Sequence, residues 1–288
     1  MMKMVMGRGL KSRINGGFTL VEMLVVIGII ALLAALLLPA LAGARRSAEK
    51  TAELNSLRQV GVAWQLYSEY SNNRILPGYL APEVQAAWNL SYTVKYDGTA
   101  IPAADAAAYP WRLLPYMDHA HYLLDRYIRE VDEDPRDHLS EIANEPAWGY
   151  NATYLGGWYE GINTNGLPIV RFEASDVIAR TMTEVRSDMV VFASSAQRNA
   201  GLQYDSVSDV LPGSHFVSAP TVAQTPQWSG DGATVTMLST TSAPIMRYTS
   251  AVAVVLGDGS TAGESAGRLF DQRRWISIAR TKNFTHAP

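Results

Sequence analysis

The stretch that decides the fold runs from Gly16 to Leu41 and reads GGFTLVEMLVVIGIIALLAALLLPAL. Its part from Phe18 onward holds 24 residues, of which Glu22 alone is charged. A helix of that length measures about 36 Å at about 1.5 Å per residue, which is enough to cross the apolar core of a bilayer. The sequence therefore predicts a transmembrane helix over residues 18–42.

Two features of this stretch are unusual for a simple membrane anchor. A carboxylate in a membrane helix costs about 2 to 3 kcal/mol on insertion scales, so Glu22 should have a partner or a role. Gly16 and Gly17 each lower helix propensity by about 1 kcal/mol relative to alanine, which leaves an accessible backbone in front of the apolar run. This glycine pair is therefore where we expect a protease to reach the chain.

The segment resembles the N-terminal signature of type IV pilins and type II secretion pseudopilins. That signature is a short basic leader ending in glycine, then F-T-L-x-E and an apolar run, and residues 17–20 and Glu22 match it position for position. The resemblance implies that a prepilin peptidase cuts between Gly17 and Phe18 and methylates the new amino group of Phe18. It also implies that Glu22 pairs with the N-terminal ammonium of a neighbouring subunit during filament assembly, and that Pro39 kinks the helix.

Two other kinds of N-terminal segment explain less of this sequence. A secretory signal peptide has a shorter apolar region of about 7 to 15 residues, and its small residues follow that region instead of preceding it. A plain signal anchor accounts for the length of the run but for neither Glu22 nor the glycine pair.

The charges in front of the apolar run predict the topology. Four cations and no acidic residue lie among residues 1–17, namely Lys3, Arg8, Lys11 and Arg13. Positive charge of this kind stays on the cytoplasmic side, so the rest of the chain should cross the membrane. We therefore expect a single-pass protein of the inner membrane with a periplasmic head, or, after assembly, a subunit of an extracellular filament.

The charge and the cysteine content of the chain restrict which partners and which catalytic or metal sites it can have. Loss of the four leader cations lowers the formal net charge from −3 to −7, which disfavours nucleic acid as a partner. A local basic patch remains an alternative, although a solvated charged face is the simpler interpretation; its residues are Arg268, Arg273, Arg274 and Arg280. The chain has no cysteine, which excludes cysteine nucleophiles and thiolate metal sites.

Beyond the membrane run the helix should continue as an amphipathic segment over residues 43–73. Apolar residues recur there at three- and four-residue steps: Leu54, Leu57, Val60, Trp64 and Tyr67. The charged residues should lie on other faces: Glu49, Lys50, Glu53, Arg58 and Glu69. One helix from Phe18 to Tyr70 is the simplest interpretation, and Asn72, Asn73, Pro77 and Gly78 should end it.

The remaining residues, 74–288, should form an α+β head in which the long helix packs on an antiparallel sheet, as in pilins. We expect loops with short helical turns over residues 78–109 and two helical pieces around Pro115 within residues 111–131. Predicted strands are Ile169–Phe172, Met189–Ala193, Thr234–Leu238, Ala251–Leu256 and Trp275–Ala279, because these segments are short and rich in β-branched residues. Most tryptophans of the head should fill its core.

Three segments of the head resemble a large pilin-like family of unknown function. They are PWRLLPYMDH at 110–119, GYNATYLGG at 149–157 and AVVLGDGSTAGE at 253–264. The last contains an Asp258-Gly259 turn signal, but Ser260 stands where that family usually has histidine.

Signatures of common enzymes are missing from the sequence. It contains no G-x-S-x-G elbow, no G-x-x-x-x-G-K-[ST] phosphate loop and no H-E-x-x-H helix. We therefore expect neither catalysis nor a cofactor. We also expect no metal at His119 and His121 with Asp118 and Asp125, or at the acidic cluster Asp132, Glu133, Asp134 and Asp137. Asp231 and Asp258, each followed by glycine, should form turns.

These observations favour a structural subunit of a type IV pilus or a type II secretion pseudopilus. Its expected partners are prepilin peptidase, other pilin or pseudopilin subunits in a homo- or hetero-filament, and the inner membrane. The alternative is a membrane-tethered periplasmic ligand-binding or enzymatic domain that uses the pilin export route. A convergent polar pocket in the head would favour that alternative.

Overall fold

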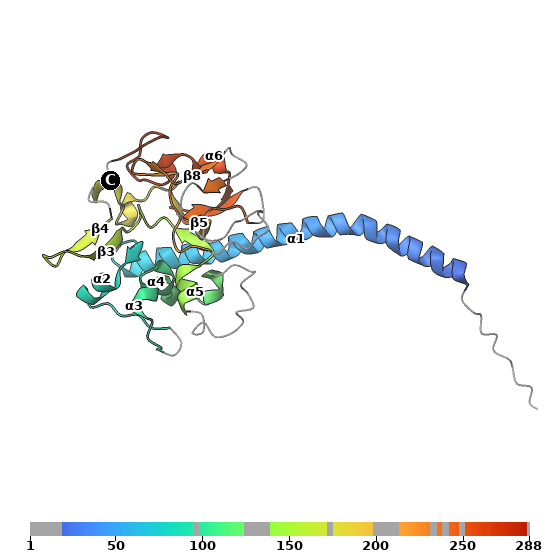
Figure 1. Cartoon of the computed structure of the whole chain (residues 1–288), viewed down its shortest axis with the longest axis horizontal. Helices are drawn as coiled ribbons and strands as arrows, with labels where there is room; N and C mark the ends of the chain where they lie inside the picture. Colours follow the sequence, from blue (N-terminus) through green and yellow to red (C-terminus); the bar gives the residue numbers. More distant parts are fainter. Residues whose placement is uncertain are drawn as a thin grey trace, which may run out of the picture. The chain divides into compact units, whose positions relative to one another are not determined.

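The computed structural model describes residues 19–94, 98–123, 139–171, 175–197, 213–230, 235–237, 242–247 and 251–286. The chain divides into two compact units, Met1–Ala48 and Glu49–Pro288. Helix α1, Leu20–Tyr70, contributes to both units (Figure 1). It begins directly after Thr19 and is continuous through Pro39, so the predicted long helix is confirmed and ends at the predicted residue.

The head is built from short helical elements and short strands, as expected for the α+β class. The α-helices after α1 are α2 (Pro82–Ala87), α3 (Ala103–Ala106), α4 (Tyr109–Leu113), α5 (Leu139–Asn144) and α6 (Ala266–Leu269). The 3₁₀ helices are η1 (Leu114–Tyr116), η2 (Ala120–Leu123), η5 (Ser175–Val177), η6 (Met182–Glu184) and η7 (Gln272–Arg274). The strands are β1 (Tyr79–Leu80), β2 (Trp148–Tyr150), β3 (Trp158–Ile162), β4 (Pro168–Val170), β5 (Val190–Gln197), β6 (Thr221–Val222), β7 (Thr225–Pro226), β8 (Trp228–Gly230), β9 (Val235–Met237), β10 (Ser242–Pro244), β11 (Val252–Leu256) and β12 (Thr261–Glu264).

An antiparallel five-stranded sheet organises the head. Strand β5 is its central member and pairs with β2, β10 and β11, while β12 pairs with β11. In register, Val254 lies opposite Ala193 of β5 and Ala262 of β12. The predicted antiparallel sheet is therefore confirmed.

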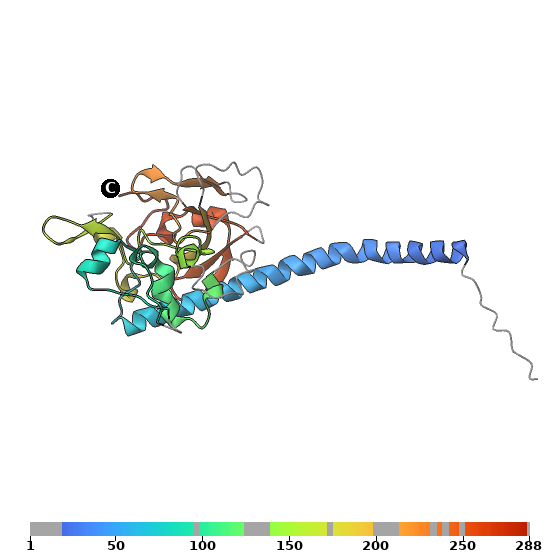
Figure 2. The ribbon, with the colours of Figure 1, turned by 60° about the horizontal axis from the view of Figure 1, so that its bottom comes forward.

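A smaller three-stranded sheet has order β1-β3-β4 and is mixed, because β1 pairs with β3 in parallel and β4 pairs with it in antiparallel. Figure 2 shows the β3–β4 hairpin at the margin of the head, with its connecting loop directed outward. Among the described residues, β6 also pairs with β7 and β8 with β9, both in antiparallel.

The C-terminal part of α1 packs on the five-stranded sheet. Leu57, Val60 and Trp64 are fully buried in one cluster with alternate residues of β11, Ala253 and Val255. The intervening residues of β11 belong to a second cluster, which includes Trp228, Leu269 and Trp275. Strand β11 is thus covered on both faces, which explains why it is apolar throughout instead of alternating with polar residues.

Loop 76–78, which follows α1, is fixed by two of the three head segments described above. Arg112 donates hydrogen bonds to the carbonyls of residues 77 and 78, at 2.9 and 3.3 Å. The hydroxyl of Tyr150 donates to the carbonyl of residue 76 at 2.9 Å and accepts from the Trp64 indole at 3.3 Å. Gly156 has φ +73°, and a Cβ there would lie 1.9 Å from the carbonyl oxygen of residue 76. These segments therefore hold the end of α1 in the head.

Several predicted strands and helices lie at the predicted places in the sequence. Segments 169–172, 189–193, 234–238 and 251–256 overlap strands β4, β5, β9 and β11, respectively. Residues 78–109 hold short helices and a two-residue strand. Of the segment 111–131, residues 111–123 are helical in short pieces around Pro115, whereas residues 124–131 lie outside the described residues. Tryptophans 111, 148, 228 and 275 are buried as expected, whereas Trp88 is 41% exposed.

One of the predicted strands is wrong. The segment Trp275–Ala279 is not a strand but a turn segment after η7. Trp275, Ile276 and Ala279 are buried because they cover one face of the sheet, and the Trp275 carbonyl accepts from the buried Asn151 amide at 2.9 Å. Glu49 and Glu53 of α1, which were expected on other faces than the apolar stripe, are only 7% and 6% exposed.

A histidine whose two ring nitrogens are buried should give the head a pH-dependent stability. His215 lies beside Tyr79, Trp158 and Phe216, with ring centroids 5.1 to 6.3 Å apart. Burial lowers its pKa from 6.5 to about 4. In the unfolded chain His215 is protonated below about pH 6.5, whereas in the folded chain it is protonated only below about pH 4. Acidification from pH 6.5 to pH 4 therefore favours unfolding.

We expect this histidine to remove up to about 3 kcal/mol from the free energy of unfolding between pH 6.5 and 4. Urea unfolding of the full chain in neutral detergent at several pH values measures the loss. His215→Phe should flatten the curve in this window, and His119→Phe, at an exposed site, should leave it unchanged. Identical pH dependence for wild type and His215→Phe would contradict the assignment.

Candidate functional site

The first half of α1 presents an apolar surface that one helix cannot cover by itself. Large apolar side chains between Leu20 and Leu41 are 44% to 81% exposed. Within α1 the most apolar window of 18 residues has a mean hydropathy of 3.0, and by length and composition the helix is able to cross a membrane. In water such a surface carries a large hydrophobic cost, so it requires lipid or other apolar helices around it.

Glu22 lies in the first turn of α1 and closes a capping box with Thr19. The Glu22 carboxylate accepts from the Thr19 backbone N–H at 2.8 Å and from its hydroxyl at 2.7 Å. The Glu22 backbone N–H donates in return to the Thr19 hydroxyl oxygen at 3.2 Å. This arrangement satisfies backbone donors that the helix start leaves without partners. Thr19 belongs to the F-T-L-x-E signature, and its T-x-x-E spacing to Glu22 is the sequence signal for this capping box.

The other N-terminal residues predicted from the sequence are placed as follows. Gly17 and Phe18 lie outside the described residues, directly before Thr19. Pro39 lies inside α1, where the helix is continuous. The predicted roles of Gly17 and Phe18 in cleavage and methylation, of Glu22 in assembly and of Pro39 in a kink therefore stay predictions.

The head residues that the sequence suggested as possible metal ligands are either exposed or outside the described residues. Asp118 and His119 are exposed, while the side chain of His121, Asp125 and the acidic cluster at 132–137 lie outside the described residues. Over the described ranges, no group of three or more His, Asp or Glu residues is placed to hold a metal ion.

Asp258 forms a turn, as predicted. Its carboxylate accepts from the backbone N–H of Ser260 at 2.9 Å and from the Ser260 hydroxyl at 2.6 Å, and these hydrogen bonds lower the pKa of Asp258. Gly259 has φ +83°, a value that favours glycine. The turn joins β11 to β12, and the Asp258 carbonyl accepts from Gln65 of α1 at 3.3 Å. Ser260 thus stabilises the turn at the place where the resembling family has histidine.

The arginines considered as a basic patch do not form one solvated face. Arg274 is 8% exposed, whereas Arg280 lies on the exposed surface. Arg268, Arg273 and Arg274 line a common cleft together with residues that the sequence analysis did not single out. The expectation of a simple solvated face is therefore wrong for Arg274.

Comparison with known proteins identifies the N-terminal segment. Residues 12–38 match the prokaryotic N-terminal methylation motif. Comparisons with curated proteins and with solved structures give no match. The matched region contains the glycine pair, the capping box and the apolar run up to residue 38. The chain thus carries the type IV pilin-like signature of precursors that prepilin peptidase processes, and this signature is followed by a long apolar helix and an α+β head.

Proposed function

We propose that this chain is a structural subunit of a type IV pilus or a type II secretion pseudopilus. Prepilin peptidase would cleave it between Gly17 and Phe18 and methylate Phe18, and the mature chain would remain in the inner membrane, with its head in the periplasm, until it enters a filament. The observation that carries the proposal is the methylation motif at residues 12–38 on a helix whose apolar side chains are exposed.

The physical argument for this proposal is that the apolar side chains of α1 must be covered both before and after assembly. Before assembly, lipid covers the apolar side chains between Leu20 and Leu41. In a filament, equivalent helices of neighbouring subunits would replace the lipid, and a carboxylate–ammonium pair among them would fix the axial register. Assembly instead of catalysis is therefore the role that we propose.

The mature N-terminus tests this proposal directly. Intact-mass and peptide mass spectrometry of the protein from its native host should show a chain that begins at Phe18 and is heavier by one methyl group. A strain without prepilin peptidase should yield a chain that retains residues before Phe18 and carries no such methyl group. Unprocessed protein in a strain with active peptidase would overturn the proposal.

Assembly requires a second measurement, because processing alone does not show incorporation. Surface material sheared from cells should contain the processed chain together with other pilin-like subunits, and it should lack the chain when the peptidase is absent. Processed protein that occurs only as membrane monomer would favour the tethered-domain alternative.

A further inference from the structure

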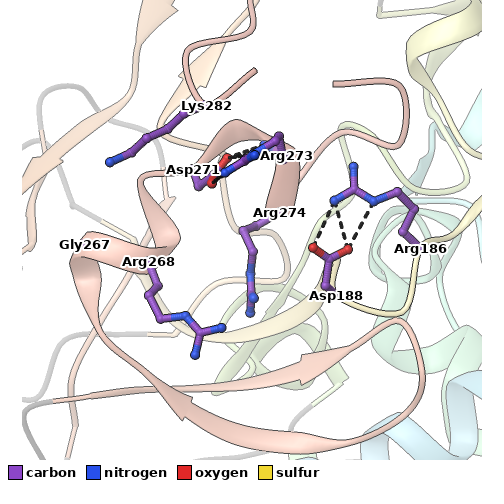
Figure 3. Close-up of a pocket in the computed structure, with 8 residues that line it drawn as sticks. All are labelled: Arg186, Asp188, Gly267, Arg268, Asp271, Arg273, Arg274 and Lys282. Carbon is purple, nitrogen blue, oxygen red and sulfur yellow. Dashed lines mark hydrogen bonds and ion pairs between the residues drawn. The ribbon is translucent and has the colours of Figure 1, made fainter. Parts of the chain in front are cut away.

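A basic cleft lies in the head, on the side of the C-terminal segment (Figure 3). It has a volume of about 520 Å³, which is in the range of small-molecule sites. Arg186 and Asp188 come from the connection between η6 and β5, and the other lining residues follow β12 in the chain: Gly267, Arg268, Asp271, Arg273, Arg274 and Lys282. Residues about 90 positions apart in sequence thus converge on one cavity.

The carboxylates at the cleft are already neutralised by its own cations. Asp188 pairs with Arg186 at 2.9 Å, and Asp271 pairs with Arg273 through both carboxylate oxygens. The hydrogen bonds from Arg273 lower the pKa of Asp271, so this carboxylate is charged at neutral pH.

Two cationic groups are left in excess. Glu264, which is 4% exposed, accepts from Arg274 at 2.7 Å and pairs with Arg268 at 3.1 Å, so one carboxylate serves two guanidinium groups. Lys282, on the exposed rim, makes no ion pair within 4 Å to a carboxylate of the described residues. The cleft therefore carries two more positive than negative charges, although the mature chain as a whole is acidic.

The cations that a ligand in the cleft can reach are the exposed ones. The Nε–H of Arg274 is enclosed by protein atoms, and Arg274 is 8% exposed, so this residue contributes its charge and not an accessible donor. The side chain of Arg268 is 66% exposed, and Lys282 is exposed on the rim, so both present donors to the cleft. The arginine fork matches the oxygen geometry of a phosphate group.

We propose that this cleft binds the dianionic phosphate group of a small ligand. A phosphate monoester carries a charge of about −1.5 to −2 at neutral pH, which balances the two excess cations of the cleft. Its oxygens would accept from Arg268 and Lys282, and the cavity has room for an organic group attached to the phosphate. This proposal stands independently of the filament role.

Isothermal titration calorimetry of the full chain in neutral detergent tests the proposal with inorganic phosphate as the probe. We expect saturable binding of phosphate and much weaker binding of acetate, because a monoanion leaves one excess cation unbalanced. Lys282→Gln and Arg268→Gln should each weaken phosphate binding about tenfold, the effect of losing one charge-assisted contact. Both side chains are exposed, so neither substitution should impair folding.

Arg171→Gln is the matched control. Arg171 is 44% exposed on its side chain and pairs with Glu160 beside the three-stranded sheet, outside the cleft. Its loss should leave phosphate binding unchanged. Equal weakening by all three substitutions, absence of saturable binding, or acetate binding as tight as phosphate binding would overturn the proposal.

A second arm of the experiment distinguishes the sources of the phosphate group. A soluble short-chain phosphatidate is titrated next to inorganic phosphate and glycerol phosphate. Binding of inorganic phosphate and glycerol phosphate as tight as that of the phosphatidate indicates a soluble phosphate ester as the ligand class, whereas at least about tenfold tighter binding of the phosphatidate indicates a lipid headgroup. In either case the same two cleft variants should reduce binding.

Discussion

Replacement of Arg112 by leucine should remove at least about 3 kcal/mol from the free energy of unfolding, a large part of the 5 to 15 kcal/mol that stabilises typical domains. Arg112 is 3% exposed, and its guanidinium donates to four backbone carbonyls, those of residues 77, 78, 107 and 108, at 2.9 to 3.3 Å. No carboxylate of the described residues pairs with it, and burial lowers its pKa. Leucine would fill the space but leave these buried acceptors without donors.

Urea unfolding of the full chain in neutral detergent, followed by tryptophan fluorescence, measures the effect. Arg112→Lys should restore only part of the stability, because an ammonium group lacks the planar fork that reaches several carbonyls at once. Arg171→Leu, at an exposed pair with Glu160, should change the free energy of unfolding by no more than about 1 kcal/mol. A leucine variant at position 112 as stable as the Arg171 control would show that these hydrogen bonds contribute little.

Replacement of Glu22 by alanine should reduce incorporation into filaments at least about a hundredfold, if the proposed function holds. Removal of one member of a buried ion pair costs about 3 to 5 kcal/mol, because the other charge, here the ammonium of Phe18, is left without compensation. Quantitative mass spectrometry of sheared surface fractions, relative to the membrane pool, measures incorporation. Membrane insertion and leader cleavage should be unaffected.

The capping box makes a sharper version of this experiment possible. Glutamine at position 22 can still accept from the Thr19 backbone and hydroxyl groups, but it carries no charge. Glu22→Gln should therefore fail to assemble as Glu22→Ala does, whereas Thr19→Ala, which keeps the carboxylate, should assemble better than either. Recovery of assembly by glutamine would show that the carboxylate acts as a helix cap and not as an ionic partner.

Features with a local physical cause could be predicted from the sequence. The extent of α1 follows from an uninterrupted apolar run and a three- and four-residue periodicity, and the structure ends the helix at Tyr70 as predicted. The Asp258-Gly259 turn follows from the backbone freedom of glycine and the short side chain of aspartate. Strands β5 and β11 could be predicted because β-branched residues, which favour strands, are frequent in both segments.

Features that depend on tertiary contacts could not be predicted in this way. The segment from Trp275 to Ala279 has a strand-like composition, yet it covers the sheet as a turn segment because the other face of β11 needs an apolar cover. The basic cleft depends on Arg186 and Lys282, which no local pattern links to Arg274. Neither the burial of Arg274 nor its pairing with Glu264 has a signal in the spacing of the sequence.

The fixation of loop 76–78 has a mechanical consequence. Arg112 and Tyr150 hold this loop, which lies shortly after the end of α1 at Tyr70, while Leu57, Val60 and Trp64 hold the helix along the sheet. Tension applied along the helix axis must therefore shear the helix–sheet contacts and break the loop contacts together, instead of opening them one after another. We expect the head to resist a pulling force as one cooperative body, and single-molecule force spectroscopy should show a single rupture event for it.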